Sequence, residues 1–572
     1  MIDAVTFQVL QSRLSGIVQE MQEHIFRTGY STVIRESQDA SCMILDVEGA
    51  VVGEHVVLPL HVSALPAALR AVRAAFGDDI GPGDAFITND PYVAGVPHAM
   101  DMAIVSPVFH RGRLVAFCGS IAHKSDLGGM VAGSANATAT DMFQECIQYP
   151  PLRFVRAGEI VRDVEAILRA NSRTPDLILG DIRGQVGVGR LGEIRLNEMF
   201  DRYGIDAALE AFAHKQNVTE ARVRAELARW PDGEHEAESF LDGTAGQANS
   251  AIRFHVRVTK RGSRIRFDFS GSDDQSRSPI NIRPPLVHGC IYYALIATID
   301  PQLSNNGGVA RVVETTFRPG SVLDPAYPAA CNTYMPTALG VTETCLRALS
   351  GFVPSRRMAG VGGSGAVSVG GNRADGTRFV QYDLGGSAYG GRAVSDGPSG
   401  IAVLLSNARS APIEVIESEY PTRIRRFELV PDSGGAGTYR GGLAARREYE
   451  ILADTASVTL RASGHDTPAF GRDGGLPGRT ARCTLNAGTP GERHFPSRFS
   501  GLALTRGDVL TVDKGGGGGL GDPAGRDFQR IVDDVLDGYV SREATHTEYG
   551  IAPERLERAL DAWEPVALSN TR

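Results

Sequence analysis

Glycine-rich strings in the second half of the sequence constrain the fold more than any other feature. The chain has 572 residues, of which 67 are glycine. After residue 359, strings such as GVGGSGAVSVGG (360–371) and GGGGG (515–519) alternate with short apolar runs. Glycine is unfavourable inside a helix and permits tight turns. We therefore expect a β-rich, loop-rich architecture for this half rather than a helical bundle.

The first half of the sequence differs, because its longest apolar patterns have helical spacing. Apolar residues recur at helical spacing over 3–28, and helical patterns also cover 62–77 and 175–230. Two segments read as β-hairpins: 41–58, turning at Glu48-Gly49, and 102–121, turning at Arg111-Gly112. The N-terminal part is thus expected to combine helices with a sheet.

Further along, 252–272 reads as a hairpin about Arg261-Gly262 and 285–299 as a buried helix, with strands expected at 457–464, 481–488 and 508–516. The predicted class is α+β and multi-domain, β-rich, with an N-terminal α+β metal-binding part and a Gly-rich β C-terminal part. The expected regions are 1–232 (N-terminal, metal site), 233–425 (central, α+β), 426–525 (Gly-rich β) and 526–572 (C-terminal, helical).

Charge and composition exclude several classes of protein. The net charge is −9 and no long single-sign run occurs, whereas nucleic acids and anionic membrane surfaces require a basic face. No apolar stretch reaches the ~18–20 residues of a membrane span, and the N-terminus lacks the pattern of a secretory signal. The seven cysteines are scattered without a C-x-x-C motif. We expect a cytoplasmic enzyme with reduced thiols that binds neither nucleic acid nor membrane.

Two His-x-x-Asp pairs lie about twenty-five residues apart: His98 with Asp101, and His123 with Asp126. The spacing alone is equally compatible with two unrelated surface loops. The predicted hairpin between the pairs favours a shared site, because a two-residue turn at 111–112 makes residues whose numbers sum to roughly 223 face each other.

In that register Asp101 is expected opposite Ala122 and His98 near Ser125, each to within one or two residues. Both pairs then lie at the open end of one hairpin. Converging imidazoles and carboxylates bind divalent transition metals such as Zn²⁺, Mn²⁺ or Fe²⁺. Asp39, at the open end of the other predicted hairpin, could add a further carboxylate.

Other motifs give weaker signals. The GGGGG string is followed by no G-K-[S/T] and no helix start, so it is expected to be structural rather than a phosphate-binding loop. The 360–371 string lacks the strand-turn-helix frame of a dinucleotide site. Cys42 lies in an apolar strand and is expected to be a core residue.

Eight segments of the sequence occur together in a characteristic order. They are RTGYSTVIRESQDASCMILDVEG, TNDPYVAGVPHAMD, AHKSDLGGMVAGS, FQECIQYPPLR, LGDIRGQVGVGRLG, FDFSGSDDQSRSPIN, PDSGGAGTYRGG, and GDVLTVDKGGGGGLGDP with DVLDGYVS. With these segments the chain resembles, nearly end to end, the hydantoinase B/5-oxoprolinase family. The family includes B subunits of ATP-dependent N-methylhydantoinases and related lactamases, the C-terminal half of 5-oxoprolinase, and a large subunit of acetone carboxylase-type enzymes.

The resemblance implies a metal site formed by Asp39, His98, Asp101 and His123, with Asp126 as ligand or supporting residue. It also implies an ATP-binding A-type partner with an actin-like nucleotide fold, in a hetero-oligomer such as α2β2. Two departures concern substrate identity more than metal binding: Lys124 stands where the family often has a second histidine, and AGVP replaces Gly-Gly-Thr before His98.

The activity implied is hydrolysis of a cyclic amide such as a hydantoin or a 5-oxoproline-type lactam. The partner would activate the carbonyl with ATP, the metal would lower the pKa of a bound water, and Asp126 or Asp39 would act as general base. Two alternatives remain: a subunit of an acetone carboxylase-like enzyme, and a non-catalytic scaffold for the ATPase partner.

Overall fold

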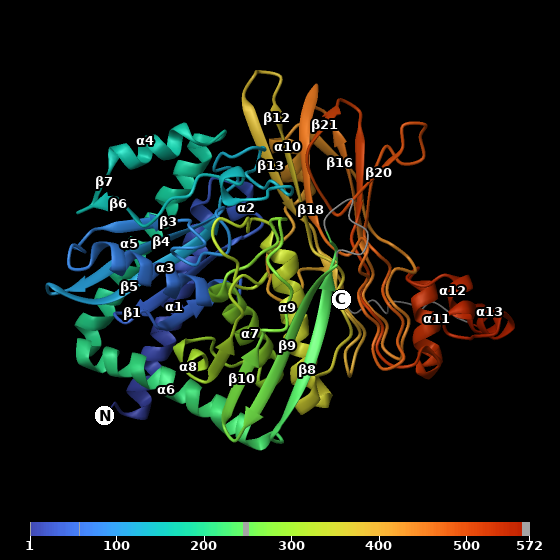
Figure 1. The fold of residues 1–572 in the computed structure, drawn as a ribbon, viewed down its shortest axis with the longest axis horizontal. Helices are drawn as coiled ribbons and strands as arrows, with labels where there is room; N and C mark the ends of the chain where they lie inside the picture. The colour runs from blue at the N-terminus through green and yellow to red at the C-terminus, as the bar shows by residue number, and fades with distance from the viewer. Residues whose placement is uncertain (1, 56–57, 244–250, 563–572) are drawn as a thin grey trace, which may run out of the picture.

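The computed structural model describes residues 2–55, 58–243 and 251–562. It confirms the predicted mixed, multi-domain architecture (Figure 1). The N-terminal region is built on a seven-stranded sheet of order β2-β1-β5-β4-β3-β6-β7. Its strands are β1 (Ala40–Asp46), β2 (Val51–His55), β3 (Ala85–Thr88), β4 (Asp101–His110), β5 (Arg113–His123), β6 (Leu152–Arg156) and β7 (Glu159–Ile160).

Helices cover both faces of this sheet. Side chains alternate in direction along each strand, and here both sets are apolar, so each face packs against helices. Cys42, Ile44 and Cys118 join the core formed with α1 (Ala4–Thr28) and α5 (Pro175–Tyr203). Their chain neighbours Met43, Leu45 and Phe117 instead pack with Leu65 and Leu69 of α3 (His61–Phe76). Asp101 and His123, the predicted metal ligands on β4 and β5, lie on the α3 face.

The predicted long helices are present, with breaks that the apolar pattern does not show. Over 175–230 the chain forms two helices, α5 and α6 (Ile205–Arg229), because Gly204 adopts a φ of 84° between them. The C-terminal region is likewise divided. Gly538, at a φ of 74°, follows the first of its helices. These are α11 (Phe528–Leu536), α12 (Arg542–Thr547) and α13 (Pro553–Asp561). The end of the predicted 526–572 segment lies outside the described residues.

A second sheet follows the hairpin predicted about Arg261-Gly262. It consists of β8 (Gly233–Leu241), β9 (Ile252–Arg261), β10 (Arg264–Asp268) and β11 (Val313–Thr316), in the order β11-β10-β9-β8. The helix predicted at 285–299 is α7 (Pro284–Ile299), which packs against α9 (Tyr334–Phe352). Shorter elements are α2 (Thr32–Arg35), α4 (Arg162–Ala170), α8 (Gly307–Ala310) and α10 (Ile413–Glu419).

The C-terminal half forms two sheets with a shared core. One has the order β13-β12-β18-β21 and the other β16-β17-β22-β19-β20. Val458 and Leu460 of the first pack with Tyr449 and Val512 of the second. The strands are β12 (Gly365–Asn372), β13 (Arg378–Leu384), β16 (Thr422–Leu429), β17 (Ala445–Ile451), β18 (Thr455–Ala462), β19 (Arg482–Leu485), β20 (Arg493–Phe495), β21 (Arg498–Thr505) and β22 (Val509–Asp513), beside a small pair β14 (Ser387–Ala388) and β15 (Ser399–Ile401).

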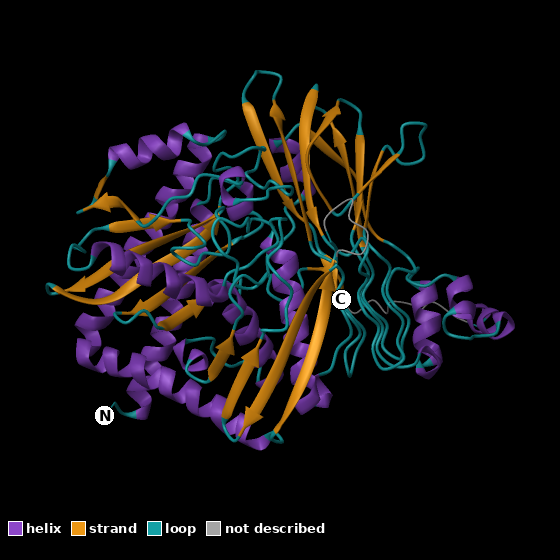
Figure 2. Cartoon of the chain, in the orientation of Figure 1, coloured by secondary structure: helices purple, strands orange, loops and turns teal. Residues whose placement is uncertain are grey.

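The glycine-rich strings run side by side beneath these sheets, next to α11 (Figure 2). Their backbones bond directly to one another: Gly391 N–H donates to Gly518 O at 2.8 Å, and Gly518 N–H to Gly360 O at 2.9 Å. A Cβ on Gly517 would lie 2.0 Å from the carbonyl oxygen of Tyr389. Only glycine permits such close backbone packing, so the structural role predicted for the GGGGG string is confirmed.

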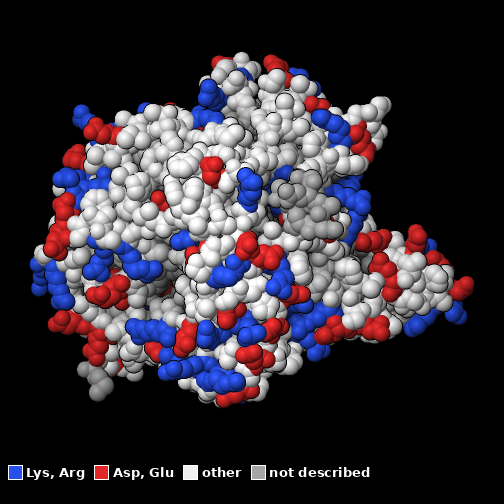
Figure 3. Space-filling view, in the orientation of Figure 1, with Lys and Arg blue, Asp and Glu red and all other residues white. Residues whose placement is uncertain are grey.

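The surface carries charges of both signs. On the face shown in Figure 3, acidic and basic side chains are interspersed over the N-terminal region, the sheets and the terminal helices. Within the described part of the chain, no helix combines the length and the apolar character needed to cross a membrane.

Candidate metal centre

A β-bulge in the β4–β5 hairpin sets the register of the site. Next to the turn, His110 faces Arg113, as a two-residue turn at 111–112 predicts. The bulge between Val108 and Phe109 then shifts the pairing by one residue. Asp101 therefore faces His123 and not Ala122, which corrects the predicted register. The shift puts both side chains on the same face of the sheet.

Backbone hydrogen bonds bring the other two predicted ligands to the same strand ends. Asp101 N–H donates to His98 O at 3.0 Å, which folds the preceding loop over the start of β4. His123 N–H donates to Asp39 O at 3.1 Å, just before β1 begins. The four residues named from the sequence, Asp39, His98, Asp101 and His123, thus meet at one edge of the sheet.

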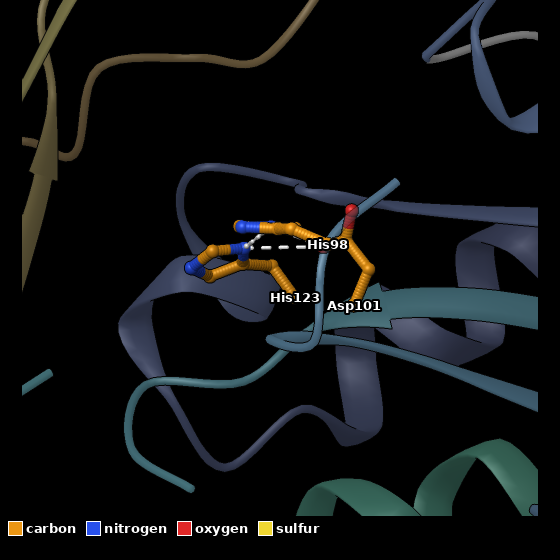
Figure 4. A group of neighbouring side chains, drawn as sticks. All are labelled: His98, Asp101 and His123. Atoms are coloured by element: carbon orange, nitrogen blue, oxygen red, sulfur yellow. Dashed lines mark hydrogen bonds and ion pairs between the residues drawn. The ribbon is translucent and has the colours of Figure 1, made fainter. Parts of the chain in front are cut away.

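Three of these side chains converge on one point (Figure 4). The distances are 3.2 Å from His98 Nε2 to His123 Nδ1, 3.1 Å from His123 Nδ1 to Asp101 Oδ1, and 3.2 Å from His98 Nε2 to Asp101 Oδ1. An ion about 2.0–2.2 Å from three ligand atoms requires them to lie roughly 2.9–3.5 Å apart. The triangle therefore fits a divalent transition metal.

The environment keeps His123 and Asp101 in metal-binding form. Burial lowers the pKa of His123 to about 4, so its imidazole is neutral at pH 7. Burial by itself would raise the pKa of Asp101, but the neighbouring histidines hold it well below its usual range. Oδ2 of Asp101 and Nε2 of His123 are buried without a hydrogen-bond partner among the described residues. Neither of these two atoms belongs to the ligand triangle, which is formed by Oδ1 of Asp101, Nδ1 of His123 and Nε2 of His98.

Asp39 is placed beside the triangle as a further carboxylate. Its side chain is half-buried and borders the cavity described below. Burial, together with the negative charge of Asp101, raises its pKa well above the usual range. Asp39 can therefore bind the ion or hold a proton next to it.

Asn332 orients His98 although the sequence motifs gave no sign of it. Its Nδ2 donates to Ser134 O at 2.5 Å, which fixes the amide so that Oδ1 accepts from His98 Nδ1 at 2.6 Å. The backbone N–H of Asn332 in turn donates to buried Glu145 at 2.6 Å. A histidine that donates from Nδ1 offers the lone pair of Nε2 to a metal, which is the geometry found here.

His61 supports Asp101 from the opposite side. It is the first residue of α3, and its Nδ1 lies 3.0 Å from Ser41 Oγ. Its Nε2 lies 3.7 Å from Oδ2 of Asp101 and has no closer described partner. The second oxygen of Asp101 is thus held towards an imidazole rather than towards the ligand triangle.

Asp126 is not part of the triangle of His98, Asp101 and His123. Both of its oxygens are engaged: Oδ1 accepts from the backbone N–H groups of Gly128 and Arg173, and Oδ2 from Gly133 N–H and the Arg173 guanidinium at 3.0 Å. Lys124 points to the other face of the sheet and donates to Gln185 of α5 at 2.5 Å. That departure from the family pattern therefore leaves the ligands untouched.

The centre opens on a cavity of about 600 Å³ between the N-terminal sheet and the C-terminal sheets. The start of α9 supplies Tyr334, β13 supplies Tyr382 and β18 supplies Arg461. The ring of Tyr334 is 4.7 Å from that of His98, and the ring of Tyr382 is 4.5 Å from that of His123, measured between centroids. One feature of the sequence indicates this wall, namely that the predicted strand at 457–464 contains a charged residue, Arg461. The two histidines that the wall faces lie more than 200 residues earlier in the sequence, beyond the reach of local patterns.

The fold and the site together define a multi-domain α/β protein with a buried His-Asp-His cluster that borders a cavity. The chain belongs to the hydantoinase B/oxoprolinase family, whose model matches residues 3–523. It is 31% identical to the B component of a putative D-/L-hydantoinase from Pseudomonas sp. strain NS671, over 96% of this chain and 95% of that protein.

Two solved structures share the fold. The ATP-dependent caprolactamase of Pseudomonas jessenii superposes with a TM-score of 0.88 at 25% identity, over 96% of this chain and 97% of that one. A nucleotide-free acetone carboxylase superposes with a TM-score of 0.85 at 19% identity, over 99% of this chain and 84% of that one. The second likeness concerns the fold alone.

Proposed function

We propose that the chain is the metal-dependent subunit of an ATP-dependent cyclic-amide hydrolase that acts on a hydantoin or 5-oxoproline-type lactam. The observation that carries the proposal is the ligand triangle of His98, Asp101 and His123 at the wall of a cavity of about 600 Å³. The similarity to a hydantoinase component and to a caprolactamase supports it. Asp39, His98, Asp101 and His123 would hold the metal.

The cavity has the character of a small-molecule site. Its volume of about 600 Å³ suits a small ring, within the ~300–1,000 Å³ typical of ligand pockets. Leu58, Met335 and Leu339 provide apolar wall against ring methylenes, whereas Asn332 and Tyr334 provide polar contacts. A divalent ion bound there would supply a water of lowered pKa and polarise a carbonyl.

The chain's own residues then have distinct roles. Asp39, whose pKa is raised by burial and by Asp101, is placed to take a proton within the cavity. Asn332 keeps Nε2 of His98 turned towards the ligand triangle. Because the oxygens of Asp126 already accept hydrogen bonds from Gly128, Gly133 and Arg173, we assign Asp126 to loop ordering and not to proton transfer.

An ATP-binding A-type subunit completes the proposal, because an unstrained cyclic amide is resonance-stabilised and needs activation. The sequence contains no G-x-x-x-x-G-K-[S/T] motif that would let this chain hold the nucleotide itself. We propose a cytoplasmic hetero-oligomer such as α2β2, with an interface of more than ~2,000 Å² for an obligate complex.

The test combines the purified chain with the product of a neighbouring A-type gene. The assay measures ring opening of hydantoin, 5-oxoproline and caprolactam with ATP, for the pair and for each chain alone. The proposal expects turnover by the pair only, and no micromolar ATP binding to the lone chain by calorimetry. ATP turnover that requires bicarbonate and a ketone would instead support the carboxylase alternative.

A further inference from the structure

Arg461 is a buried cation on the wall of the cavity. Its Nη1 donates to the backbone oxygen of Asn332 at 3.1 Å, and its Nη2 to the hydroxyl of Tyr382. Its guanidinium carbon is 5.2 Å from the centroid of the Tyr382 ring. Its Nε has no hydrogen-bond partner among the described residues. A buried charge is expensive unless it is paired.

Four other buried arginines among the described residues are paired with carboxylates. Arg153, Arg440, Arg447 and Arg526 each have a carboxylate oxygen within hydrogen-bonding distance. Within the described part of the chain, Arg461 has no carboxylate within ion-pair distance. Arg498 shares this property, but it donates to the backbone oxygen of Asp242 at 2.6 Å and does not line the cavity.

The position of Arg461 relates it directly to the metal centre. The backbone oxygen of Asn332 that accepts from Arg461 also lies 3.0 Å from Nδ1 of His98. One carbonyl thus joins the guanidinium to a ligand of the triangle. Arg409 lies exposed on the same cavity, and its guanidinium has no partner among the residues that the structure describes.

We propose that Arg461 is the anion-binding residue of the cavity and pairs with an oxyanion of the molecule that reacts at the metal centre. The inference rests on the proposed function, which supplies two such oxyanions: a phosphoryl group on the ATP-activated intermediate and the carboxylate of the ring-opened product. The planar guanidinium matches either group. Arg409 would attract the anion from solvent.

The test uses the metal-loaded chain without partner or ATP. Inorganic phosphate and acetate are titrated calorimetrically into the wild type and into Arg461→Gln, Arg461→Lys and Arg409→Ala. Arg498→Gln is the matched control, because it removes a buried arginine that has no carboxylate and does not line the cavity. The anion that binds more tightly identifies which of the two groups the residue recognises.

We expect Arg461→Gln to weaken binding of the preferred anion by about tenfold or more, since a charge-assisted hydrogen bond is lost. Arg461→Lys keeps the charge and should weaken it less, and it decides the question if the Gln variant does not fold. The effect of Arg409→Ala should disappear at high salt, and Arg498→Gln should leave affinity unchanged.

Equal anion affinity in the wild type and the folded Arg461 variants, or no anion binding by the wild type, would overturn the inference. The hydrolase assay is independent of this titration. If the chain and its partner open no cyclic amide but Arg461-dependent anion binding persists, the proposed function fails and the anion site stands.

Discussion

Replacing Asn332 by alanine tests how the protein prepares His98 for a metal. The change removes the acceptor 2.6 Å from His98 Nδ1. Loss of such a supporting group typically costs ~10–100-fold in metal affinity. The backbone oxygen of Asn332, 3.0 Å from the same nitrogen, survives the substitution. We therefore expect the lower end, about tenfold or ~1.4 kcal/mol.

The assay is a competition titration of Zn²⁺ between the protein and a chromogenic chelator, at a pH where His123 is neutral. Asn306→Ala is the control, because Asn306 is also buried and donates from Nδ2 to a side chain, Thr219, at 2.8 Å. It should lower thermal stability and leave metal affinity unchanged. Equal metal affinity in Asn332→Ala and the wild type would refute the orienting role.

Three further changes have distinct expected outcomes. Asp39→Asn should lower metal affinity by about 10–100-fold, and an unchanged competition titration would reduce Asp39 to a structural role. Burial raises the pKa of Glu343 from 4.5 to about 7, so the wild type loses stability as pH rises between those values. Glu343→Gln should therefore have a higher free energy of unfolding than the wild type above pH 7, by at most ~3 kcal/mol, and no such advantage below pH 4.5. The same difference in free energy of unfolding between the variant and the wild type at every pH from 4.5 to 7 would contradict this. Gly517→Ala, whose Cβ would meet Tyr389 O at 2.0 Å, should prevent stable folding, whereas Gly16→Ala in α1 has open space and should stabilise by ~1 kcal/mol; a fully stable Gly517→Ala would refute the packing of the strings.

The local parts of the metal centre were predictable from the sequence, because they depend on one hairpin and its neighbour. A turn at 111–112 is enough to place Asp101 near His123, and the antiparallel pairing of β1 with β5 brings Asp39 beside them. The actual register differs by one residue from the one expected opposite Asp101, because of the bulge between Val108 and Phe109. The residues of the turn do not indicate this bulge. That single residue decides which side chain faces Asp101.

The remainder of the site depends on contacts between distant segments. Asn332 lies 234 residues from His98 in the sequence, and Arg461 lies 129 residues from Asn332. Periodicity reports the local element and its buried face, but not which element packs opposite. The glycine strings show the same limit: their role in tight packing was predictable, but their mutual bonding, such as Gly391 to Gly518, was not.

The metal content of the purified protein tests the central claim most directly. Elemental analysis of the wild type should give one divalent transition-metal ion per chain. His98→Ala and His123→Ala should each give none while remaining folded, because each removes a corner of the ligand triangle. His494→Ala, an exposed histidine on β20, should retain the ion. Stoichiometric metal in both His98→Ala and His123→Ala would place the site elsewhere, and a metal-free but functional wild type would favour the scaffold alternative.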